Sequence, residues 1–508
     1  MSVLGSASTL SRRAEAALER LGDHRSLCFE GAWQTSGALA ARARRAAAGL
    51  VALGVRPGDR VVLCMANCPE VGVAYAALWR AGAVATPVLF LLSEDELRHV
   101  MTDSGAVAVV TTPEFLPKVR ASAGGVPVVV VGGAADATVP WSDLEGADEL
   151  GIVDRTPDDL AALLYTGGTT GRSKGVALTH AGLDAAGHAG SLAGRAPGRV
   201  RGLLPLPLAH VYGLMVSVSA LHAVEPGETV LMRWFDAAGF LSLVEQHRTQ
   251  TSALVPSMIS MLLAQPLEER DLSSLQRLSS GGAPLAPELA VELERRIPGV
   301  EVHEGYGCTE SSALISAQPP DGRRLGSVGK PVAGVTVRIA GADGADLPPG
   351  EDGEICVRGP VLMTGYWHAP EATAETLRDG ELHTGDVGHL DDDGYLYVVD
   401  RIKDLIIRNG FNVYPRDVED VLLAHPEITG AAVVGRPDPR TGEEVVAFVS
   451  VAPGSSLTPD RVVAYAKQHL SAAKYPREVR VVDTIPLTSV LKTDRKALRR
   501  RLTSGGLP

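Results

Sequence analysis

The sequence predicts an α/β protein whose large N-terminal domain is followed by a small second domain. Short apolar runs alternate with stretches of helical period between residues 12 and 319, as where 36–53 is followed by 60–65. Glycine and proline mark the changes, for example in residues 54–59. The length of 508 residues also exceeds one ordinary hydrophobic core. This alternation is typical of layered, mostly parallel sheets covered by helices.

The pattern changes twice after residue 319. Short β-rich segments separated by Asp-Gly and Pro-Gly turns fill residues 326–400 and predict a small antiparallel subdomain that resembles a β-barrel. After residue 400 the sequence predicts a small α+β unit, with helices and strands over 416–425, 431–435, 445–451 and 459–470. We therefore place the domain boundary at 400–403.

Composition and charge exclude several classes of protein. With 60 acidic and 48 basic residues the net charge is -12, which argues against nucleic acid or an anionic membrane as the main partner. No run approaches the ~18 apolar residues that a membrane-spanning helix needs, and no targeting segment is apparent, so we expect a soluble, cytoplasmic protein. The basic run 495–501 predicts a solvated terminal helix.

Cysteine and acidic clusters do not predict a metal site of their own. The five cysteines are scattered and odd in number, which favours reduced thiols. Cys64 and Cys68 are not accompanied by a second Cys/His pair, so core packing explains them better than zinc. Residues 391–394 lack the glutamate of a calcium-binding loop and predict a hairpin turn.

The most informative segment for function is 165–175, with the sequence YTGGTTGRSKG. Glycine lets the backbone approach a ligand closely, while hydroxyl groups and an ammonium group suit polyphosphate oxygens. The spacing does not match a Walker loop, because Lys174 is preceded by Ser173 and followed by Gly175. A flexible turn is the alternative for an isolated stretch of this kind. The residues predicted to hold ATP here are Thr166, Gly167, Gly168, Thr169, Thr170 and Lys174.

This loop resembles the signature loop of the adenylate-forming superfamily, which includes acyl-CoA synthetases, firefly luciferase and the adenylation domains of peptide synthetases. Further motifs follow in the family's order over nearly the whole chain: LPLPLAHVYGL (204–214), SSGGAPL (279–285), HEGYGCTES (303–311), the TGD and DRxKD signatures within 383–404, RNGFNVYPRDVED (408–420) and IPLTSVLKTDRKALRR (485–500). The chain departs from the family at Ser173, where proline is usual. It departs again at Val490 and Leu491, where Thr or Ser and then Gly usually precede a lysine.

The resemblance implies roles for residues of the N-terminal domain. Tyr306 offers a flat face for adenine, Thr309 a hydroxyl for the α-phosphate and Glu310 a carboxylate for Mg²⁺. Catalysis would involve Glu310, Thr166 and His210, the last at the mouth of the acyl pocket. Further nucleotide-binding residues would be Gly282, Ala283, Pro284, Glu304, Gly305 and Gly307. The acyl pocket would be lined by His210, Val211, Gly213, Val255, Ser257, Gly281, Tyr306 and Ala313.

The resemblance also implies roles for residues towards the C-terminus. Asp386 would accept hydrogen bonds from the ribose, and Arg401 would lie near ribose and phosphate. Lys403 occupies the hinge position, and Gly410 would let a pantetheine arm pass close to the backbone. Lys492 corresponds to the catalytic lysine of adenylation. The implied domains are 1–400, a hinge at 401–403 and a mobile C-terminal domain at 404–508.

The implied reaction activates a carboxylic acid, with ATP, Mg²⁺ and CoA as cofactors. The carboxylate attacks the α-phosphorus of ATP to give an acyl-adenylate and pyrophosphate, and a thiol then displaces AMP. Residues 211–224 contain no acidic side chain to pair with an ammonium group, and Asp236 is interpreted as structural, so a non-amino acid is favoured. We expect an aliphatic or alicyclic acid of medium to long chain, with an aryl acid as the second choice.

Three alternatives stay open at the level of sequence. The acceptor is either CoA or the phosphopantetheine thiol of an acyl carrier protein, which share the same arm. A luciferase-like monooxygenase would use the same adenylate, although fold and motifs alone do not imply oxygen chemistry. A non-catalytic binder is suggested only by the departures from the family, and the retained Glu310 and Lys492 argue against it. The oligomeric state is not predicted.

Overall fold

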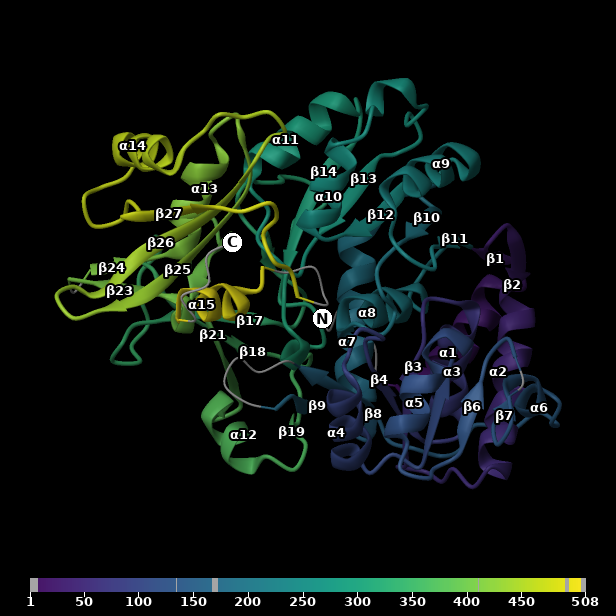
Figure 1. Ribbon diagram of the computed structural model, residues 1–508. Helices are drawn as coiled ribbons and strands as arrows, with labels where there is room; N and C mark the ends of the chain where they lie inside the picture. Colours follow the sequence, from purple (N-terminus) through teal and green to yellow (C-terminus); the bar gives the residue numbers. More distant parts are fainter. Residues whose placement is uncertain (1–7, 134, 167–171, 410, 489–492, 504–508) are drawn as a thin grey trace. The chain divides into compact units, whose positions relative to one another are not determined.

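The structure is a computed structural model that describes residues 8–133, 135–166, 172–409, 411–488 and 493–503 (Figure 1). The chain divides into two compact units. The first comprises Met1–Leu285, Leu289–Thr336 and Val357–Leu382, and the second comprises Ala286–Glu288, Val337–Cys356 and His383–Pro508. The predicted α/β fold class is confirmed. The second unit begins before residue 400, and a hinge at 401–403 stays a prediction.

An eight-stranded sheet forms one layer of the first unit, in the order β19-β9-β8-β4-β3-β5-β6-β7. The strands from β3 to β8 pair in parallel, whereas β9 runs antiparallel to β8. Their apolar residues form continuous runs because both faces of a parallel sheet are covered. The bounds are β3 Arg60–Cys64, β4 Val84–Pro87, β5 Ala108–Thr111, β6 Val128–Val130, β7 Val139–Pro140, β8 Leu160–Thr166, β9 Lys174–Thr179 and β19 Gly365–Tyr366.

A nine-stranded sheet forms a second layer, in the order β16-β15-β14-β13-β12-β10-β11-β1-β2. The strands from β14 to β1 in this order are parallel, and antiparallel strands extend both edges. The bounds are β1 Arg25–Phe29, β2 Ala32–Thr35, β10 Arg201–Leu204, β11 Glu228–Leu231, β12 Thr251–Leu254, β13 Arg277–Ser280, β14 Glu301–Tyr306, β15 Ser316–Ala317 and β16 Lys330–Pro331.

Helices cover these sheets, and local capping explains several of their starts. The Thr35 side chain accepts from the Ala38 amide at the start of α2, and Ser93 with Glu96 forms a capping box at α4. Asp236 caps α9 by accepting from Gly239, so the structural interpretation of Asp236 is confirmed. The bounds are α1 Leu10–Leu21, α2 Ser36–Ala52, α3 Pro69–Arg80, α4 Glu94–Ser104, α5 Leu116–Ser122, α6 Trp141–Glu145, α7 His180–Gly194, α8 Val211–Ala220, α9 Ala237–His247, α10 Pro256–Leu263, α11 Pro287–Arg296 and α12 Pro370–Thr376, with 3₁₀ turns η1 Pro113–Phe115, η2 Leu267–Glu269 and η3 Thr309–Ser311.

A curled antiparallel sheet corresponds to the predicted barrel-like subdomain. It contains β17 Thr336–Ala340, β18 Gly353–Arg358, β21 Glu381–Leu390 and β20 Leu377–Arg378 in this order, with β22 Leu396–Arg401 paired to β21. The β21–β22 connection is a tight turn in which the Asp391 carboxylate accepts from the amides of Asp393 and Tyr395, at 3.0 and 2.9 Å. The predicted hairpin turn is therefore confirmed.

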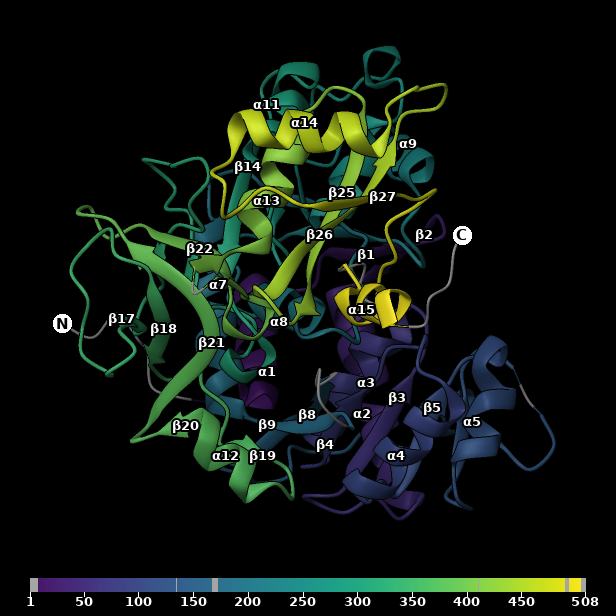
Figure 2. The same ribbon diagram turned by 60° about the vertical axis from the view of Figure 1, so that its left-hand side comes forward.

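The C-terminal sheet has the order β24-β23-β26-β25, with β27 paired to β26. Helices α13 and α14 cover one face of β25 and β26, and α15 packs on the other face through Leu498 (Figure 2). The bounds are η4 Ile402–Asp404, β23 Ile406–Arg408, β24 Phe411–Val413, α13 Pro415–Leu423, β25 Ile428–Asp438, β26 Gly442–Val451, α14 Pro459–His469, β27 Glu478–Val481 and α15 Arg495–Thr503.

The basic helix expected at 495–501 is present, and Lys496, Arg500 and Arg501 are exposed, but its other face is packed and not solvated. Arg495 bonds both oxygens of Glu419, at 2.7 and 2.8 Å, and Arg499 pairs with Asp404 at 2.9 Å. Leu498 is fully buried. Partners distant in sequence therefore hold one face of this basic helix against the rest of the unit.

All five cysteines are free thiols, as expected. Burial raises the pKa of Cys64 to about 11 and that of Cys68 to about 12, which agrees with a packing role. Among the described residues, no helix has the length and apolar composition needed to cross a membrane.

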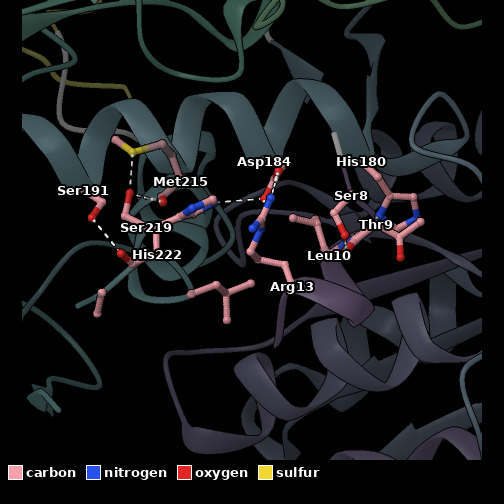
Figure 3. A network of polar contacts seen from close by, with 12 residues as sticks. Ser8, Thr9, Leu10, Arg13, His180, Asp184, Ser191, Met215, Ser219 and His222 are labelled. Atoms are coloured by element: carbon pink, nitrogen blue, oxygen red, sulfur yellow. Dashed lines mark hydrogen bonds and ion pairs between the residues drawn. The ribbon is translucent and has the colours of Figure 1, made fainter. Parts of the chain in front are cut away.

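A polar network joins the N-terminal helix to α7 and α8 (Figure 3). Arg13 on α1 donates two hydrogen bonds of 2.9 Å to the carboxylate of Asp184 on α7. His222, just after α8, bonds the same carboxylate at 2.9 Å. At the start of α7, Nδ1 of His180 accepts from the Leu10 amide at 3.3 Å, and its Nε2 is buried without a hydrogen-bond partner in the described part of the chain.

Because His180 is buried, we expect the free energy of unfolding to depend on pH. Burial, and next the charge of Arg155, lower the pKa of His180 from 6.5 to about 4. Between these values the unfolded chain binds a proton that the folded chain does not, so the free energy of unfolding falls as the pH falls. The full difference corresponds to about 3 kcal/mol. Urea unfolding followed by tryptophan fluorescence at pH 7 and pH 4.5 measures it.

His180→Gln is the matched variant, because glutamine keeps an acceptor for the Leu10 amide and does not titrate. We expect this variant to lose less stability than the wild type between the two pH values. Equal losses in both proteins would contradict the assignment.

Candidate active site

Several predicted site residues lie at one edge of the nine-stranded sheet. Strands β10, β12, β13 and β14 are adjacent and parallel, so their carboxyl ends share that edge. His210 comes after β10, Val255 follows β12, residues 281–284 follow β13, and residues 304–307 end β14. This is the edge at which α/β sheets bind ligands. The fold therefore brings together segments that are up to about a hundred positions apart in the chain.

His210 is oriented by the helix that follows it. It is the N-cap of α8, where its Nδ1 accepts from the Tyr212 amide at 3.2 Å. Val211 begins the helix and is buried. A side chain on Gly213 would place Cβ at 2.3 Å from the Pro207 carbonyl oxygen. Packing thus requires glycine at this position. No contact with a ligand is needed to explain Gly213.

The glycine pair after β13 lies among other predicted pocket residues. A Cβ on Gly281 would lie 3.3 Å from the Tyr212 ring. Gly282 has a φ of 80°, which favours glycine, and a Cβ there would lie 3.7 Å from the Val255 side chain. The Ser257 hydroxyl is buried without a hydrogen-bond partner among the described residues. Ala283 and Pro284 continue the same segment, with Pro284 exposed.

A strained turn follows β14 and carries the predicted magnesium ligand. Thr309 begins η3 and Glu310 lies within it. Ser312 and Ala313 have φ values of 51° and 83°, which non-glycine residues rarely adopt. A Cβ on Gly307 would lie only 2.1 Å from the Ala313 carbonyl oxygen. The absence of a side chain at Gly307 therefore lets this turn fold back over the end of β14.

The two ends of the segment 167–171, which lies outside the described residues, are held by α4. Thr166 pairs with Lys174 where β8 and β9 meet the segment. The Tyr165 hydroxyl donates to Asp103 at 2.6 Å, and the His99 ring bonds the Ser173 carbonyl at 2.9 Å. Gly167, Gly168, Thr169 and Thr170 lie in the segment itself. No motif of the sequence had indicated His99 and Asp103.

A tyrosine connects Lys174 to Glu310. The Lys174 ammonium lies 4.9 Å from the centre of the Tyr366 ring, a cation–π geometry. The Tyr366 hydroxyl donates to Glu310 Oε1 at 2.7 Å. Burial, and next the charge of Glu310, raise the pKa of Tyr366, so the hydroxyl keeps its proton. The structure thus places the predicted phosphate-binding lysine beside the predicted metal ligand, through a residue that the sequence analysis missed.

The geometry at Glu310 fits a magnesium ion. Mg²⁺ prefers hard oxygen ligands and is usually held by one or two carboxylates together with substrate phosphates. Glu310 Oε1 accepts the hydrogen bond from Tyr366, and Oε2 makes no hydrogen bond within the part of the chain that the structure describes. One carboxylate oxygen is therefore fixed by the protein while the other stays available as a ligand.

In the second unit, Asp386 and Arg401 lie opposite each other on β21 and β22. Their side chains pair at 2.8 Å, with Asp386 buried and Arg401 half exposed. The Asp386 amide donates to the Thr384 hydroxyl at 3.1 Å, and that hydroxyl donates to the Ile355 carbonyl at 2.8 Å. The predicted ribose-binding pair is thus adjacent and held by local hydrogen bonds.

A cavity of about 320 Å³ adjoins this pair and is lined by Glu354, Thr384, Gly385, Arg401, Ile402 and Lys403. Glu354 also lies near Cys356 and His383, so that one potential metal ligand atom of each lies within 4.8 Å of the others. Hydrogen bonds account for this cluster, because Glu354 bonds His383 at 2.8 Å and accepts from the Gly385 amide at 3.2 Å. We interpret Glu354 as a support for the turn that carries Asp386.

The remaining predicted residues lie at or beside undescribed positions. Lys403 is exposed on η4 and borders the cavity. Gly410 lies outside the described residues, and Asn409 before it has a φ of 50°. Lys492 also lies outside them, in a segment whose ends are joined by an antiparallel bridge between Leu487 and Thr493.

Comparison with known proteins identifies the family. A family model described as AMP-binding enzyme matches residues 14–367, and one described as AMP-binding enzyme C-terminal domain matches residues 417–492. The chain is 41% identical over 468 residues to a feruloyl-CoA synthase of Amycolatopsis sp, covering 91% of this chain and 93% of that protein. It is 37% identical over 509 residues to 4-coumarate–CoA ligase 5 of Oryza sativa subsp. japonica, covering 96% and 94%.

A solved structure leads to the same conclusion. The anthranilate CoA ligase AuaEII in complex with anthranoyl-AMP superimposes with a TM-score of 0.92 at 25% identity, covering 99% of each chain. The chain therefore belongs to the AMP-binding enzyme family, the adenylate-forming superfamily that its motifs resemble. The expected enzyme class, an AMP-forming acid–thiol ligase, is confirmed. The roles of individual residues stay predictions.

Tyr366→Phe tests the connection to Glu310. We expect the Mg²⁺ concentration for half-maximal pyrophosphate release to rise about ten-fold, because residues that support a metal ligand typically contribute this much to metal affinity. Titration of MgCl₂ at fixed ATP measures the effect.

Tyr75→Phe is the control, since the Tyr75 hydroxyl is also buried but donates to the Leu208 carbonyl. It should leave the Mg²⁺ dependence unchanged. The same Mg²⁺ requirement in Tyr366→Phe and the wild type would rule out this role for Tyr366.

Proposed function

We propose that this enzyme activates an aryl carboxylic acid of the hydroxycinnamate type as its adenylate and transfers the acyl group to CoA. The observation that carries the proposal is the 41% identity to a feruloyl-CoA synthase over 91% of the chain. The 4-coumarate–CoA ligases and the anthranilate CoA ligase are likewise named for aromatic acids. The expectation of an aliphatic or alicyclic acid has no support among these relatives, and the aryl acid takes its place.

The reaction breaks and forms one bond at each step. A carboxylate oxygen of the acid attacks the α-phosphorus of ATP, and pyrophosphate leaves. The thiolate of CoA then attacks the acyl carbon, the bond to the phosphate oxygen breaks, and AMP leaves. Because acid and triphosphate are both anions, catalysis depends on positioning and on neutralising charge.

ATP, Mg²⁺ and CoA are the cofactors this reaction uses. Bound Mg²⁺ neutralises charge on the phosphate oxygens. We assign Glu310 to hold it, because Tyr366 fixes one carboxylate oxygen and leaves the other available. Thr166 and Lys174, paired at the ends of the phosphate-binding segment, are assigned to pyrophosphate. Thr309, beside Glu310, is assigned to the α-phosphate.

The acid is assigned to the carboxyl edge of the nine-stranded sheet. His210 lies at the N-terminus of α8, where the helix dipole favours an anion such as the acid's carboxylate. Tyr306 ends β14 and is assigned to adenine. Asp386 and Arg401 are assigned to the ribose. Lys492 is assigned to adenylation, with residue 403 as the hinge of a mobile C-terminal domain.

The acceptor and the compartment belong to the same proposal. CoA is favoured because the relatives are named as CoA ligases and synthases. The phosphopantetheine of a carrier protein remains the alternative acceptor, since it ends in the same thiol. We place the enzyme in the cytoplasm, where ATP and CoA are both supplied.

Pyrophosphate release with Mg-ATP tests the proposal directly. The panel comprises hydroxycinnamic, benzoic, fatty, alicyclic and amino acids, each with and without CoA. We expect kcat/KM to be at least about ten-fold higher for the aryl acids, as is typical when a pocket matches one class of side group. CoA should accelerate turnover to a thioester.

A preference for fatty or alicyclic acids would overturn the aryl assignment. Release that CoA does not accelerate would instead favour a carrier protein as the acceptor. No release with any acid would favour the non-catalytic alternative.

Lys492→Ala and Gly410→Trp form a complementary pair. Removing the Lys492 ammonium should abolish adenylate formation, because this ammonium is the side-chain charge assigned to the transition state of adenylation, but should spare thiol transfer from synthetic acyl-AMP. Gly410→Trp should spare adenylation and block thiol transfer by filling the assigned path of pantetheine. Separate assays of the two half-reactions measure both effects. Equal loss of both half-reactions in either variant would contradict the assignment.

A further inference from the structure

Two buried polar side chains, one on β13 and one on β14, each have a nitrogen atom without a hydrogen-bond partner among the described residues. Arg277 is 5% exposed, and its Nε makes no hydrogen bond within the described residues. His303 is 3% exposed, and its Nδ1 likewise makes none. Buried polar atoms are nearly always satisfied, by the protein, by water or by a ligand. Two such atoms close together therefore require an explanation, and we refer to Arg277 and His303 as the polar floor.

Arg277 and His303 lie on the same face of the sheet as the glycines of the predicted acyl pocket. Ser279 pairs with His303, and Arg277 lies two residues before Ser279. Alternate residues of a strand point to the same face, and paired residues share a face. Arg277, Ser279 and Gly281 therefore follow one another along one face of the sheet, from the start of β13 towards the edge assigned to the adenylate.

Tyr212, which follows two residues of the predicted acyl pocket in the chain, lies on this face. Its ring lies against Gly281, where a Cβ would be 3.3 Å away, and its hydroxyl donates to the Ser279 carbonyl at 3.3 Å. The side chain thus extends from the level of Gly281 towards the polar floor. Burial raises the pKa of the Tyr212 hydroxyl, and the charge of Arg277 opposes this rise. The Arg277 guanidinium is therefore close enough to influence the Tyr212 hydroxyl electrostatically.

The depth of the polar floor suits an aryl acid. Each strand residue advances about 3.3 Å, so His303, at the level of Ser279, lies about 7 Å beyond the level of Gly281, and Arg277 about 13 Å beyond it. A cinnamoyl group that begins beside the glycines places its distal ring substituent between these two levels.

The two groups of the polar floor have complementary hydrogen-bonding roles. His303 Nε2 bonds the Glu301 carboxylate at 3.0 Å, so Nε2 carries the proton and Nδ1 is an acceptor. Burial, and next the charge of Arg277, lower the pKa of His303, which keeps the ring neutral at pH 7. Burial lowers the pKa of Arg277 to about 10, so it stays a charged donor. A donor beside an acceptor matches a hydroxyl group.

We propose that Arg277 and His303 determine specificity by binding a ring hydroxyl at the distal end of the acid. The hydroxyl oxygen accepts from the Arg277 guanidinium, and its hydrogen is donated to His303 Nδ1. A methoxy group at the same place satisfies the arginine only, and an unsubstituted ring satisfies neither group. The inference rests on the proposed function, because it takes the acid to bind along the Gly281 face.

The test compares 4-hydroxycinnamate, 4-methoxycinnamate and cinnamate. In the wild type we expect kcat/KM for pyrophosphate release to be at least about ten-fold higher for the hydroxy acid, because a hydrogen bond to a charged group contributes at least this factor. Arg277→Met and His303→Phe should each reduce the ratio of hydroxy acid to cinnamate about ten-fold while retaining turnover of cinnamate. Arg277→Lys, which keeps a charged donor, should retain part of the preference.

Arg201→Met is the matched control. Arg201 lies at the start of β10 and also has a buried Nε without a partner among the described residues. Gly202 is in register with Thr251, and Thr251 with Arg277, so Arg201 points to the opposite face. Its substitution should leave the ratio unchanged. Thermal unfolding of each variant confirms that the comparison is made between folded proteins.

Calorimetric binding of the same three acids with a non-hydrolysable ATP analogue separates this inference from the proposed function. Preferred binding of the hydroxy acid, lost in Arg277→Met, supports the polar floor even if no acid releases pyrophosphate. The polar floor is overturned if aryl acids release pyrophosphate and the ratio of hydroxy acid to cinnamate is the same in the wild type, in Arg277→Met and in His303→Phe. In that case buried water binds the two side chains. If no aryl acid binds and none releases pyrophosphate, both proposals are overturned.

Discussion

The hydrogen bond from Tyr366 to Glu310 joins the two large sheets at the candidate site. Tyr366 belongs to β19 on the eight-stranded sheet, whereas Glu310 follows β14 of the nine-stranded sheet. The Met363 amide adds a second bond, to the Glu310 carbonyl at 2.8 Å. The aromatic ring of Tyr366 lies against the Lys174 ammonium, and its hydroxyl donates to the Glu310 carboxylate. The hydroxyl of Tyr366 donates to the carboxylate without adding a charge beside it. One tyrosine thus contacts both the lysine proposed to bind phosphate and the carboxylate proposed to bind the metal.

Glycines in the candidate site are required by close backbone packing, whether or not a ligand is bound. Gly213 lets α8 pack on the Pro207 carbonyl, and Gly307 lets the turn containing Ala313 pass within contact of β14. The resemblance to the family marks these positions for substrate, and the structure adds that larger residues are excluded before any substrate binds. Close backbone packing of this kind limits how far the edge of the sheet can adjust, which favours a pocket formed in advance.

Much of the fold was predictable from the sequence, because regular elements depend on local patterns. The helix at 36–53 and the strand at 60–65 appear as α2 and β3, and the helix at 459–470 as α14. Features that depend on partners distant in sequence were not predictable. One face of the basic helix at 495–501 is packed, because Glu419 pairs with Arg495 and Asp404 pairs with Arg499. His99, Tyr366 and Arg277 carry no motif of their own. Only strand pairing and helix packing reveal what they face.

The bridge between Leu487 and Thr493 has a consequence for how the second unit works. A chain segment with free ends loses much conformational entropy when it is fixed at a reaction centre. Here the ends of the segment that contains Lys492 are already joined, and Arg495 anchors the residues that follow to α13. The anchors on either side of the segment are therefore set when the second unit folds. If Lys492 has the role proposed for it, these anchors make the second unit, and not a free chain end, the body that would carry it.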